Sequence, residues 1–285
     1  MAVVLRPTWV RLGVPFVVAL LLLLIGCTAE PPPVDVAVDE VLGLEAVAVD
    51  DGSLSGTFAL KSVAATVVKF PGLPDELGGE VGYRLQRRTY LGDGVYRQTS
   101  RLCGGHHYVV HGVNIVIDER AYRAVPLSEE VVSVDHARGT FAFADHVETW
   151  GIALDDPVRD AFPATEEDAR AHGLLDDDDD GEEGVTVRLS GTVEGEVYTV
   201  LRKRSDGSGL ILDDGVVLGL QDVRHEQTDL GASNALVAAA GGGNPEPYPD
   251  ASESWFEEVR VDDDTTCDDV MRLEAEGVLS RIRPF

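Results

Sequence analysis

Short runs in which apolar and polar residues alternate dominate the chain from Gly56 onward. A period of two is typical of strands with one buried face, and these runs are rich in β-branched and aromatic residues. The predicted strands are residues 57–68, 81–90, 95–102, 108–117, 131–134, 139–143, 185–193, 197–204, 209–212, 216–223 and 256–261. The pattern therefore predicts a mostly β protein.

Turn signals separate these strands at close spacing, among them Gly92-Asp93-Gly94, Asp206-Gly207 and Asp213-Asp214-Gly215. Glycine and aspartate favour the tight turns of hairpins. Strands joined by so few residues must pair antiparallel, because a parallel crossover needs about a dozen residues or more. We expect an antiparallel barrel or a sandwich.

Two segments carry helix signals instead. Residues 165–173 begin with a Thr165 cap, continue with acidic residues and end at Gly173. Residues 266–276 repeat this arrangement, with Asp268 and Asp269 near the start. Side-chain caps, early acids and a terminal glycine favour short helices. Residues 232–250, rich in alanine, glycine and proline, are interpreted as a long flexible loop.

The first 26 residues have a different pattern, with Arg6 and Arg11 followed by an apolar stretch over residues 14–25. This stretch is short for a membrane-spanning helix, which needs ~20 residues, and fits the core of a signal peptide. Leu24-Ile25-Gly26-Cys27 resembles the lipobox of bacterial lipoproteins. The resemblance implies that the peptide is cut before Cys27, that its thiol receives a diacylglyceryl group and that its new amino terminus is acylated, with palmitate for example.

A lipid anchor at Cys27 predicts attachment to a membrane of the cell envelope. Thr28 follows the cysteine, and it is not the aspartate that retains enteric lipoproteins at the inner membrane, so we expect the outer membrane. Pro31, Pro32 and Pro33 favour an extended spacer. The predicted organisation is a signal peptide over 1–26, a lipidated cysteine and tether over 27–50, and one β-rich domain over 51–285.

The net charge limits the classes of partner that the protein can bind. The 285 residues include 23 basic and 51 acidic side chains, a net charge of −28. Removal of residues 1–26 takes away only Arg6 and Arg11 and leaves a net charge of −30. Such a surface repels phosphate backbones, so no nucleic-acid partner is expected. A hydrophobic content of 44% also excludes a disordered acidic chain.

Cys103 and Cys267 are the other two cysteines. In an oxidising compartment, two cysteines far apart in sequence are most simply interpreted as one disulfide. Its loop contributes about 4 to 5 kcal/mol in chain-entropy models. The alternative is a metal-binding or nucleophilic role, which lacks a CxxC pair and a basic neighbourhood.

Five consecutive aspartates at residues 176–180 precede Gly181. Asp176, Asp178 and Asp180 with Gly181 resemble the first half of an EF-hand calcium loop, in which Glu182 would supply the backbone carbonyl of position seven. Position twelve is Val187 rather than glutamate, and a strand follows instead of a helix. Calcium binding and a solvated acidic turn both remain open, because adjacent carboxylates repel unless a cation or water screens them.

Histidines give a second candidate metal site. His107 and His111 would share one face of a predicted strand at a spacing of four, with His136 or His146 brought near by the fold. The alternative is a polar strand with scattered histidines. The sequence motifs of nucleophile elbows, zincins and nucleotide-binding loops do not occur.

Gly56-Thr57-Phe58 at the first strand is faintly similar to the Gly-x-Trp start of lipocalins, but the tryptophan is absent. The mature chain also resembles acidic lipoproteins of Gram-negative bacteria, of uncharacterised activity, in which an Asp-rich loop precedes a Val-Thr-Val strand. This resemblance implies no activity.

We therefore expect a monomeric, non-enzymatic envelope lipoprotein that acts as a binding or structural module, with an envelope protein as one kind of partner and with calcium as its only candidate cofactor. Two alternatives stay open. A calycin-like barrel would carry a small apolar ligand and would need an apolar cavity of several hundred Å³. A metal-dependent periplasmic hydrolase would need His107, His111 and a further ligand in one cleft.

Overall fold

The computed structural model describes residues 42–69, 74–240 and 245–281. The predicted signal peptide, Cys27 and the tether up to residue 41 lie outside these described residues. The described strands are β1 (Gly56–Val68), β2 (Glu76–Gly92), β3 (Val95–His107), β4 (Val113–Ile117), β5 (Ser128–Asp135), β6 (Thr140–Trp150), β7 (Val185–Gly191), β8 (Gly195–Ile211), β9 (Val217–Ala232), β10 (Glu246–Pro247) and β11 (Trp255–Val261).

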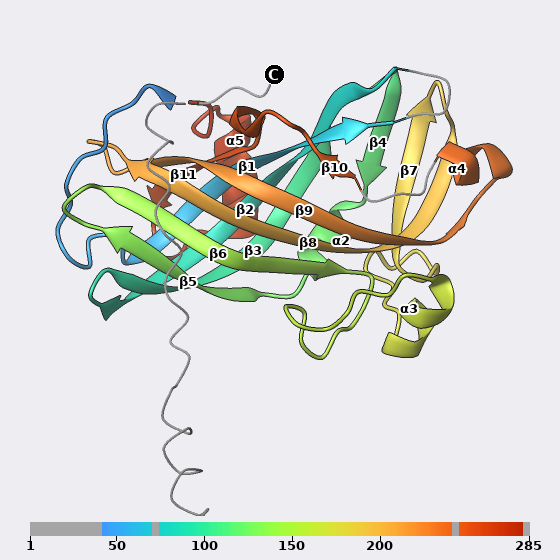
Figure 1. The fold of residues 1–285 in the computed structure, drawn as a ribbon, viewed down its shortest axis with the longest axis horizontal. Helices are drawn as coiled ribbons and strands as arrows, with labels where there is room; N and C mark the ends of the chain where they lie inside the picture. The colour runs from blue at the N-terminus through green and yellow to red at the C-terminus, as the bar shows by residue number, and fades with distance from the viewer. Residues whose placement is uncertain (1–41, 70–73, 241–244, 282–285) are drawn as a thin grey trace, which may run out of the picture. The chain divides into compact units, whose positions relative to one another are not determined.

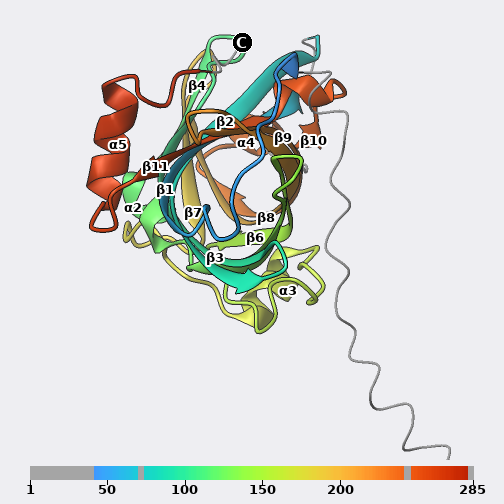
Figure 2. The same cartoon turned by 90° about the vertical axis from the view of Figure 1, so that its left-hand side faces the viewer.

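Eight of these strands close into an antiparallel barrel (Figures 1 and 2). The ring runs β8-β6-β5-β3-β2-β1-β11-β9, and β9 pairs with β8 to close it. The remaining strands extend the sheet, because β4 and β7 continue from β8 while β10 pairs with β1. The mostly β, antiparallel prediction is confirmed, and the architecture is a barrel and not a sandwich.

The two ends of the barrel have different wall strands, because the same edge of β8 pairs with β7 along one part of its length and with β6 along another. Residues 195–199 of β8 pair with β7, whereas residues 201–210 pair with β6. One end is therefore walled by β5 and β6, and the other by β4 and β7. Figure 1 shows β4 and β7 together at the end that also carries α4.

The long strand β8 corrects the prediction of two strands separated by a turn at Asp206-Gly207. The chain passes straight through these residues, which pair with Asp222 and Gln221 of β9. A Cβ on Gly207 would lie 2.5 Å from the ring of Phe143. Gly207 therefore allows a close approach inside the barrel and does not form a turn.

The described residues include four helices: α2 (Glu119–Ala124), α3 (Glu166–His172), α4 (Ala235–Ala240) and α5 (Cys267–Ala275). Two of them, α3 and α5, begin after the predicted caps Thr165 and Thr266. The other two correct the prediction of only two helices. Asn234 caps the start of α4 through its side-chain oxygen, so the predicted flexible loop contains an alanine-rich helix.

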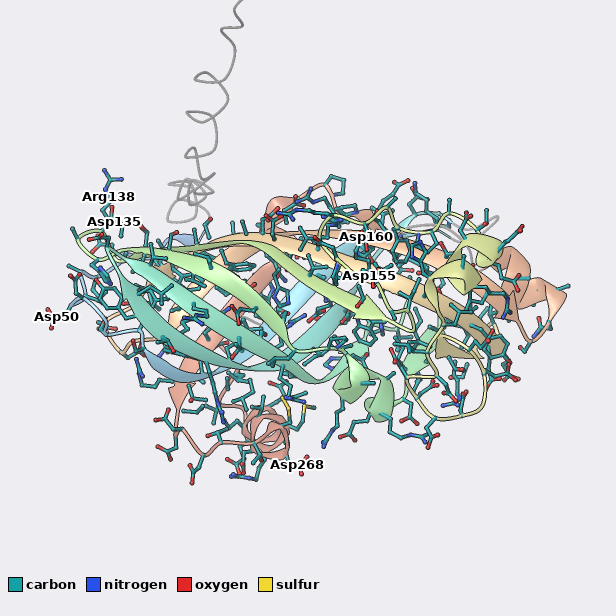
Figure 3. All side chains as sticks on the ribbon, turned by 90° about the horizontal axis from the view of Figure 1, so that it is seen from below. Asp50, Asp135, Arg138, Asp155, Asp160 and Asp268 are labelled. Atoms are coloured by element: carbon teal, nitrogen blue, oxygen red, sulfur yellow. A yellow bond between two sulfur atoms is a disulfide. The ribbon has the colours of Figure 1, made fainter. Side chains whose placement is uncertain are left out.

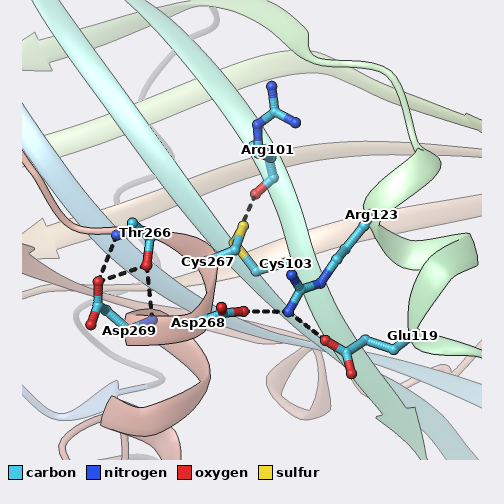
Figure 4. Close-up of a disulfide and its surroundings, with 8 residues drawn as sticks. All are labelled: Arg101, Cys103, Glu119, Arg123, Thr266, Cys267, Asp268 and Asp269. Atoms are coloured by element: carbon cyan, nitrogen blue, oxygen red, sulfur yellow. Dashed lines mark hydrogen bonds and ion pairs between the residues drawn. A yellow bond between two sulfur atoms is a disulfide. The ribbon is translucent and has the colours of Figure 1, made fainter.

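Helix α5 covers the outer face of β2 and β3 and is tied there by a disulfide (Figure 4). Cys103 of β3 and Cys267 of α5 are bonded, with their Cα atoms 4.9 Å apart. Beside them, Arg123 of α2 bonds Asp268 of α5, with 2.5 Å between Nη2 and Oδ1. The predicted disulfide is confirmed, and it fastens the last helix to the barrel wall.

Residues 42–50, the end of the predicted tether, lie against the barrel. The amides of Val47 and Val49 donate to the carbonyls of Ile211 and His136, each at 2.9 Å. Aspartates such as Asp50, Asp135 and Asp268 lie on the outside (Figure 3). In the part of the chain that the structure describes, no helix has the length and apolar composition needed to cross a bilayer.

Candidate functional site

Strand β2 shows how the interior is built, because both of its faces are buried. Its apolar side chains, including Val81 and Tyr83, face outward and pack with Val270 of α5. Its polar side chains, including Arg84 and Arg88, are 4% and 3% exposed and bond groups on β6 and β11 across the barrel. The polar face of this strand therefore points into the barrel and not into water.

The interior next to the β5–β6 end is filled by an apolar plug. Its aromatic members come from four strands, and their rings contact one another, as those of Phe143 and Phe256 do with centroids 5.5 Å apart. The plug consists of Leu54, Phe58, Leu60, Tyr96, Val132, Val134, Phe141, Phe143, Ile211, Val217 and Phe256. Arg88 lies over the rings of Phe58 and Phe141, with its Cζ 4.5 Å from each centroid.

Above the plug lies an ionic layer of four basic and four acidic side chains: Arg84, Arg88, His146, Lys203, Glu80, Glu130, Glu148 and Glu258. Arg84 forms a bidentate pair with Glu148, with Nε–Oε1 2.8 Å and Nη2–Oε2 3.1 Å. Lys203 Nζ lies 3.2 Å from Glu80 Oε2. Arg88 Nη2 lies 2.5 Å from Glu258 Oε2.

His146 connects two of the acidic groups. Its Nδ1 lies 2.8 Å from Glu130 Oε2, and its Nε2 lies 3.3 Å from Glu148 Oε1. Burial lowers the pKa of His146, but the two carboxylates outweigh burial and raise this pKa to about 9. Burial likewise raises the pKa of Glu148, yet Arg84, His146 and Lys203 hold it well below its usual value. Burial raises the pKa of Glu258, against the opposing charge of Arg88. The layer contains as many acidic as basic side chains.

The interior beyond the ionic layer, at the β4–β7 end, is hollow. A cavity of about 390 Å³ lies there. Aliphatic side chains form most of its wall, and they sit in register across β4, β7 and β8, as in the pairs Ile117–Val187 and Val187–Val197. Its lining residues include Thr66, Val67, Val68, Val110, Ile115, Ile117, Trp150, Val185, Val187, Leu189, Val197, Thr199 and Leu201.

The cavity has polar groups at two places. Near solvent, the exposed side chains of Lys69 and Glu246 form an ion pair, with Nζ–Oε2 2.7 Å. On the side of the ionic layer, Glu80, His107 and His225 also line the cavity. We call these three residues the inner polar cluster.

Both histidines of the inner polar cluster are neutral at physiological pH. Burial lowers the pKa of His107, against the opposing charge of Glu80. Burial together with Lys203 lowers the pKa of His225 to about 4. Burial raises the pKa of Glu80, but this pKa is left lowered, with the charge of Lys203 as the largest opposing cause. A paired carboxylate therefore lies beside two uncharged imidazoles.

The other predicted histidine ligands lie elsewhere. His111 is not on the strand of His107, because β3 ends at His107 and His111 occupies a turn with φ 51°. Its Nδ1 lies 2.9 Å from Glu76. His136 Nδ1 pairs with Asp51 at 2.8 Å, and His146 belongs to the ionic layer. The expectation that His107 and His111 share a strand face is therefore wrong.

The predicted calcium loop brings three carboxylates together. Asp176, Asp178 and Asp180 each offer one oxygen, and these oxygens lie within 4.8 Å of one another. Asp178 is fully buried; its Oδ2 accepts from the amide of Thr186 at 3.1 Å, while its Oδ1 has no hydrogen-bond partner among the described residues. Glu182 is exposed and is not part of this group.

This loop is attached to the cavity wall. Thr186, bonded by Asp178, lies between the lining residues Val185 and Val187 of β7. The amide of Gly151 donates to Asp177 Oδ2 at 2.5 Å, and Gly151 follows the lining residue Trp150. Burial and the neighbouring Asp180 and Asp176 raise the pKa of Asp178. The loop thus holds mutually repelling carboxylates at the ends of two wall strands.

Sequence reasoning missed the ionic layer and two members of the inner polar cluster, Glu80 and His225. A signal was present on β2, where Glu80, Arg84 and Arg88 recur every fourth residue and therefore share one face. Charged residues on one face of a strand ordinarily indicate that this face meets solvent, so the pattern alone did not point to an interior.

The chain was compared with known protein families, with characterised proteins and with solved structures, and none of the three comparisons found a match. The site is therefore interpreted from its own geometry.

Proposed function

We propose that this protein is a non-enzymatic, monomeric envelope lipoprotein that binds a small, mostly apolar molecule in the cavity at the β4–β7 end of its barrel. The observation that carries the proposal is the cavity itself. Its volume of about 390 Å³ and its aliphatic walls match the size and lining typical of small-molecule sites. In a purely structural module we would expect both ends of the barrel interior to be filled.

The cavity experiment uses an apolar fluorescent reporter, N-phenyl-1-naphthylamine, whose emission rises when it leaves water. Titration of the protein with this reporter should show saturable binding to one site. Ile115→Trp should fill the cavity from β4 and abolish the signal. Val116→Trp is the matched control, because Val116 is the next residue on β4, is 43% exposed and faces outward. Equal reporter binding by both variants, or none by the wild type, would refute the proposal.

Membrane attachment rests on the lipobox-like segment that ends at Cys27, which would place the barrel beside the outer membrane. Cys27→Ser should release the protein from the membrane fraction into the soluble fraction of the cell. Retention of this variant in the membrane would refute a lipid anchor and leave the cavity proposal standing.

We further propose that the loop of Asp176, Asp178 and Asp180 binds calcium with a structural role. The supporting observation is the buried, unpartnered Oδ1 of Asp178 next to two further carboxylates. Calcium prefers carboxylate and carbonyl oxygens, and binding would relieve the repulsion between the three side chains. The backbone carbonyl of Glu182 is the ligand that the loop pattern would add.

Thermal unfolding in millimolar Ca²⁺ tests this site. The melting temperature should rise on adding Ca²⁺, and the rise should vanish in the Asp178→Asn/Asp180→Asn variant. Asp179→Asn is the matched control, because the side chain of Asp179 is 94% exposed and its backbone already adopts φ 54°, which asparagine tolerates. A calcium effect that survives the double substitution would place any bound ion elsewhere.

A further inference from the structure

The inner end of the cavity contains polar atoms that the protein itself leaves unsatisfied. Four buried side-chain atoms of lining residues have no hydrogen-bond partner within the described part of the chain: Glu80 Oε1, His107 Nε2, Trp150 Nε1 and His225 Nδ1. A buried polar group without a partner is unfavourable, because it has lost its hydrogen bonds to water. Four of them around one cavity indicate that something polar enters it.

We propose that this end of the cavity binds the uncharged head group of an otherwise apolar ligand, and that the head both donates and accepts hydrogen bonds. An alcohol or a primary amide has this chemistry. The inference rests on the proposed function, because it assigns the ligand class of the same cavity.

The charge balance of the interior excludes a charged head. Glu80 is already paired with Lys203, which also lies 3.9 Å from Glu148. Both histidines of the inner polar cluster are neutral, and the ionic layer contains equal numbers of acidic and basic groups. An additional carboxylate or ammonium group would therefore be buried without a counter-charge, which is strongly unfavourable.

The hydrogen-bonding capacity of the lining side chains further restricts the chemistry of the head group. An ionised Glu80 only accepts hydrogen bonds, the Trp150 indole only donates, and each neutral imidazole has one donor and one acceptor nitrogen. A hydroxyl can donate to Glu80 Oε1 and accept from Trp150 or a histidine. An ether or ester oxygen can only accept, so it would leave Glu80 Oε1 unsatisfied.

A metal ion fits the inner polar cluster poorly. Zinc ligands lie near 2 Å from the ion, so their atoms lie close to one another. Among the described residues, the aspartates of the 176–180 loop are the only three His, Cys, Asp or Glu side chains whose ligand atoms gather within 4.8 Å. Glu80, His107 and His225 do not form such a group.

The experiment compares ligands that share one chain and differ only in the head. The probes are 1-dodecanol, dodecyl methyl ether, dodecanoate and dodecylammonium, each displacing the fluorescent reporter at pH 7.5. Dodecanol should bind at least about tenfold more tightly than each of the other three, because it alone satisfies Glu80 without adding charge. Equal affinities, or a preference for dodecanoate, dodecylammonium or the ether, would overturn the inference while the cavity proposal survived. Absence of displacement by every probe would overturn both.

Adjacent histidines provide a matched pair of variants. His107→Leu should lower the dodecanol-to-ether affinity ratio below that of the wild type, and His225→Leu should do the same, because each substitution removes one polar partner of the hydroxyl while Glu80 remains. His106→Leu should keep the wild-type ratio, because His106 lies on the outer face of β3 beside Tyr83 and Tyr108 and does not line the cavity. If His106→Leu changes the ratio as much as His107→Leu does, the inference is wrong. Stabilisation by Zn²⁺ that is lost in both cavity variants would instead identify a metal site and would also overturn it.

Discussion

The two ends of the barrel are built from the same antiparallel wall but have opposite interiors. Toward β5 and β6, the apolar plug and the ionic layer fill the interior, and the void among Arg84, Gln98, Glu130 and His146 is only about 20 Å³. Toward β4 and β7, the cavity is about 390 Å³. The comparison indicates that one end stabilises the fold while the other is kept open for a ligand.

Side-chain size explains much of this difference. Strand β6 contributes the rings of Phe141 and Phe143 to the filled end. At the hollow end, β4 and β7 line the cavity with the smaller side chains of Ile115, Val185 and Val187. The ionic layer separates the apolar plug from the cavity, and its member Glu80 also lines the cavity.

The largest expected effect is on the ionic layer. Arg84→Met should lower the free energy of unfolding by about 3 to 5 kcal/mol, because the buried Glu148 loses its bidentate partner. Denaturant unfolding measures the change. Arg272→Met on the exposed face of α5, where Arg272 pairs with Asp269, should cost less than about 1 kcal/mol. Similar losses in both variants would show that the layer does not stabilise the filled end.

The second prediction concerns the pH dependence of stability at the filled end, which contains His146. In the folded protein the pKa of His146 is about 9, above the value of 6.5 for an unperturbed histidine. Its stabilisation is therefore complete below pH 6.5 and is lost as pH rises to 9, by on the order of 3 kcal/mol. Denaturant unfolding at pH 6.5, 7.5 and 9 tests this, and a flat profile would contradict an ionised His146.

At the hollow end the pH dependence of stability has the opposite sign. The pKa of His225 is lowered to about 4, with Lys203, Glu80, His107 and Glu148 as its charged and titratable neighbours. Its contribution to stability is present above pH 6.5 and is lost as pH falls toward 4. His225→Leu should flatten the profile between pH 6.5 and 4.5 and leave the alkaline side unchanged.

The smallest expected effects come from two valine-to-alanine substitutions, one at each end of the barrel. Val132→Ala in the apolar plug should cost about 2 kcal/mol, because Val132 is fully buried and its methyl groups would leave a new void. Val187→Ala at the cavity wall should cost less than about 1 kcal/mol, since that side chain already borders open space. Equal losses in denaturant unfolding would mean that the cavity is collapsed in solution.

Local chemistry made the strands and two helices predictable. Alternation located β1, β2 and β3, and the Thr165 and Thr266 caps located α3 and α5 to within a residue. The pairing of Cys103 with Cys267 followed from there being only two cysteines besides Cys27. Helix α4 was missed because the glycines and prolines that follow its alanines suggested a loop, while the cap at Asn234 went unnoticed.

The candidate site was less predictable, because its residues gather only through long-range pairing. Glu80 and His225 lie on β2 and β9, which do not pair with each other, so no spacing in the chain connects them. Conversely, the close spacing of His107 and His111 suggested a site, but a turn with positive φ at His111 separates them.

The sequence by itself determined that the chain is acidic, mostly antiparallel β and crosslinked by one disulfide, because these properties depend on composition, local periodicity and cysteine number. Only the tertiary structure decided which face of each strand is inside. On β2 the alternation allowed either assignment, and the covering helix α5 directed the apolar face outward and the charges inward. Burial of those charges is tolerable because partners from β5, β6, β8 and β11 reach them across the barrel, an arrangement that ring closure alone creates.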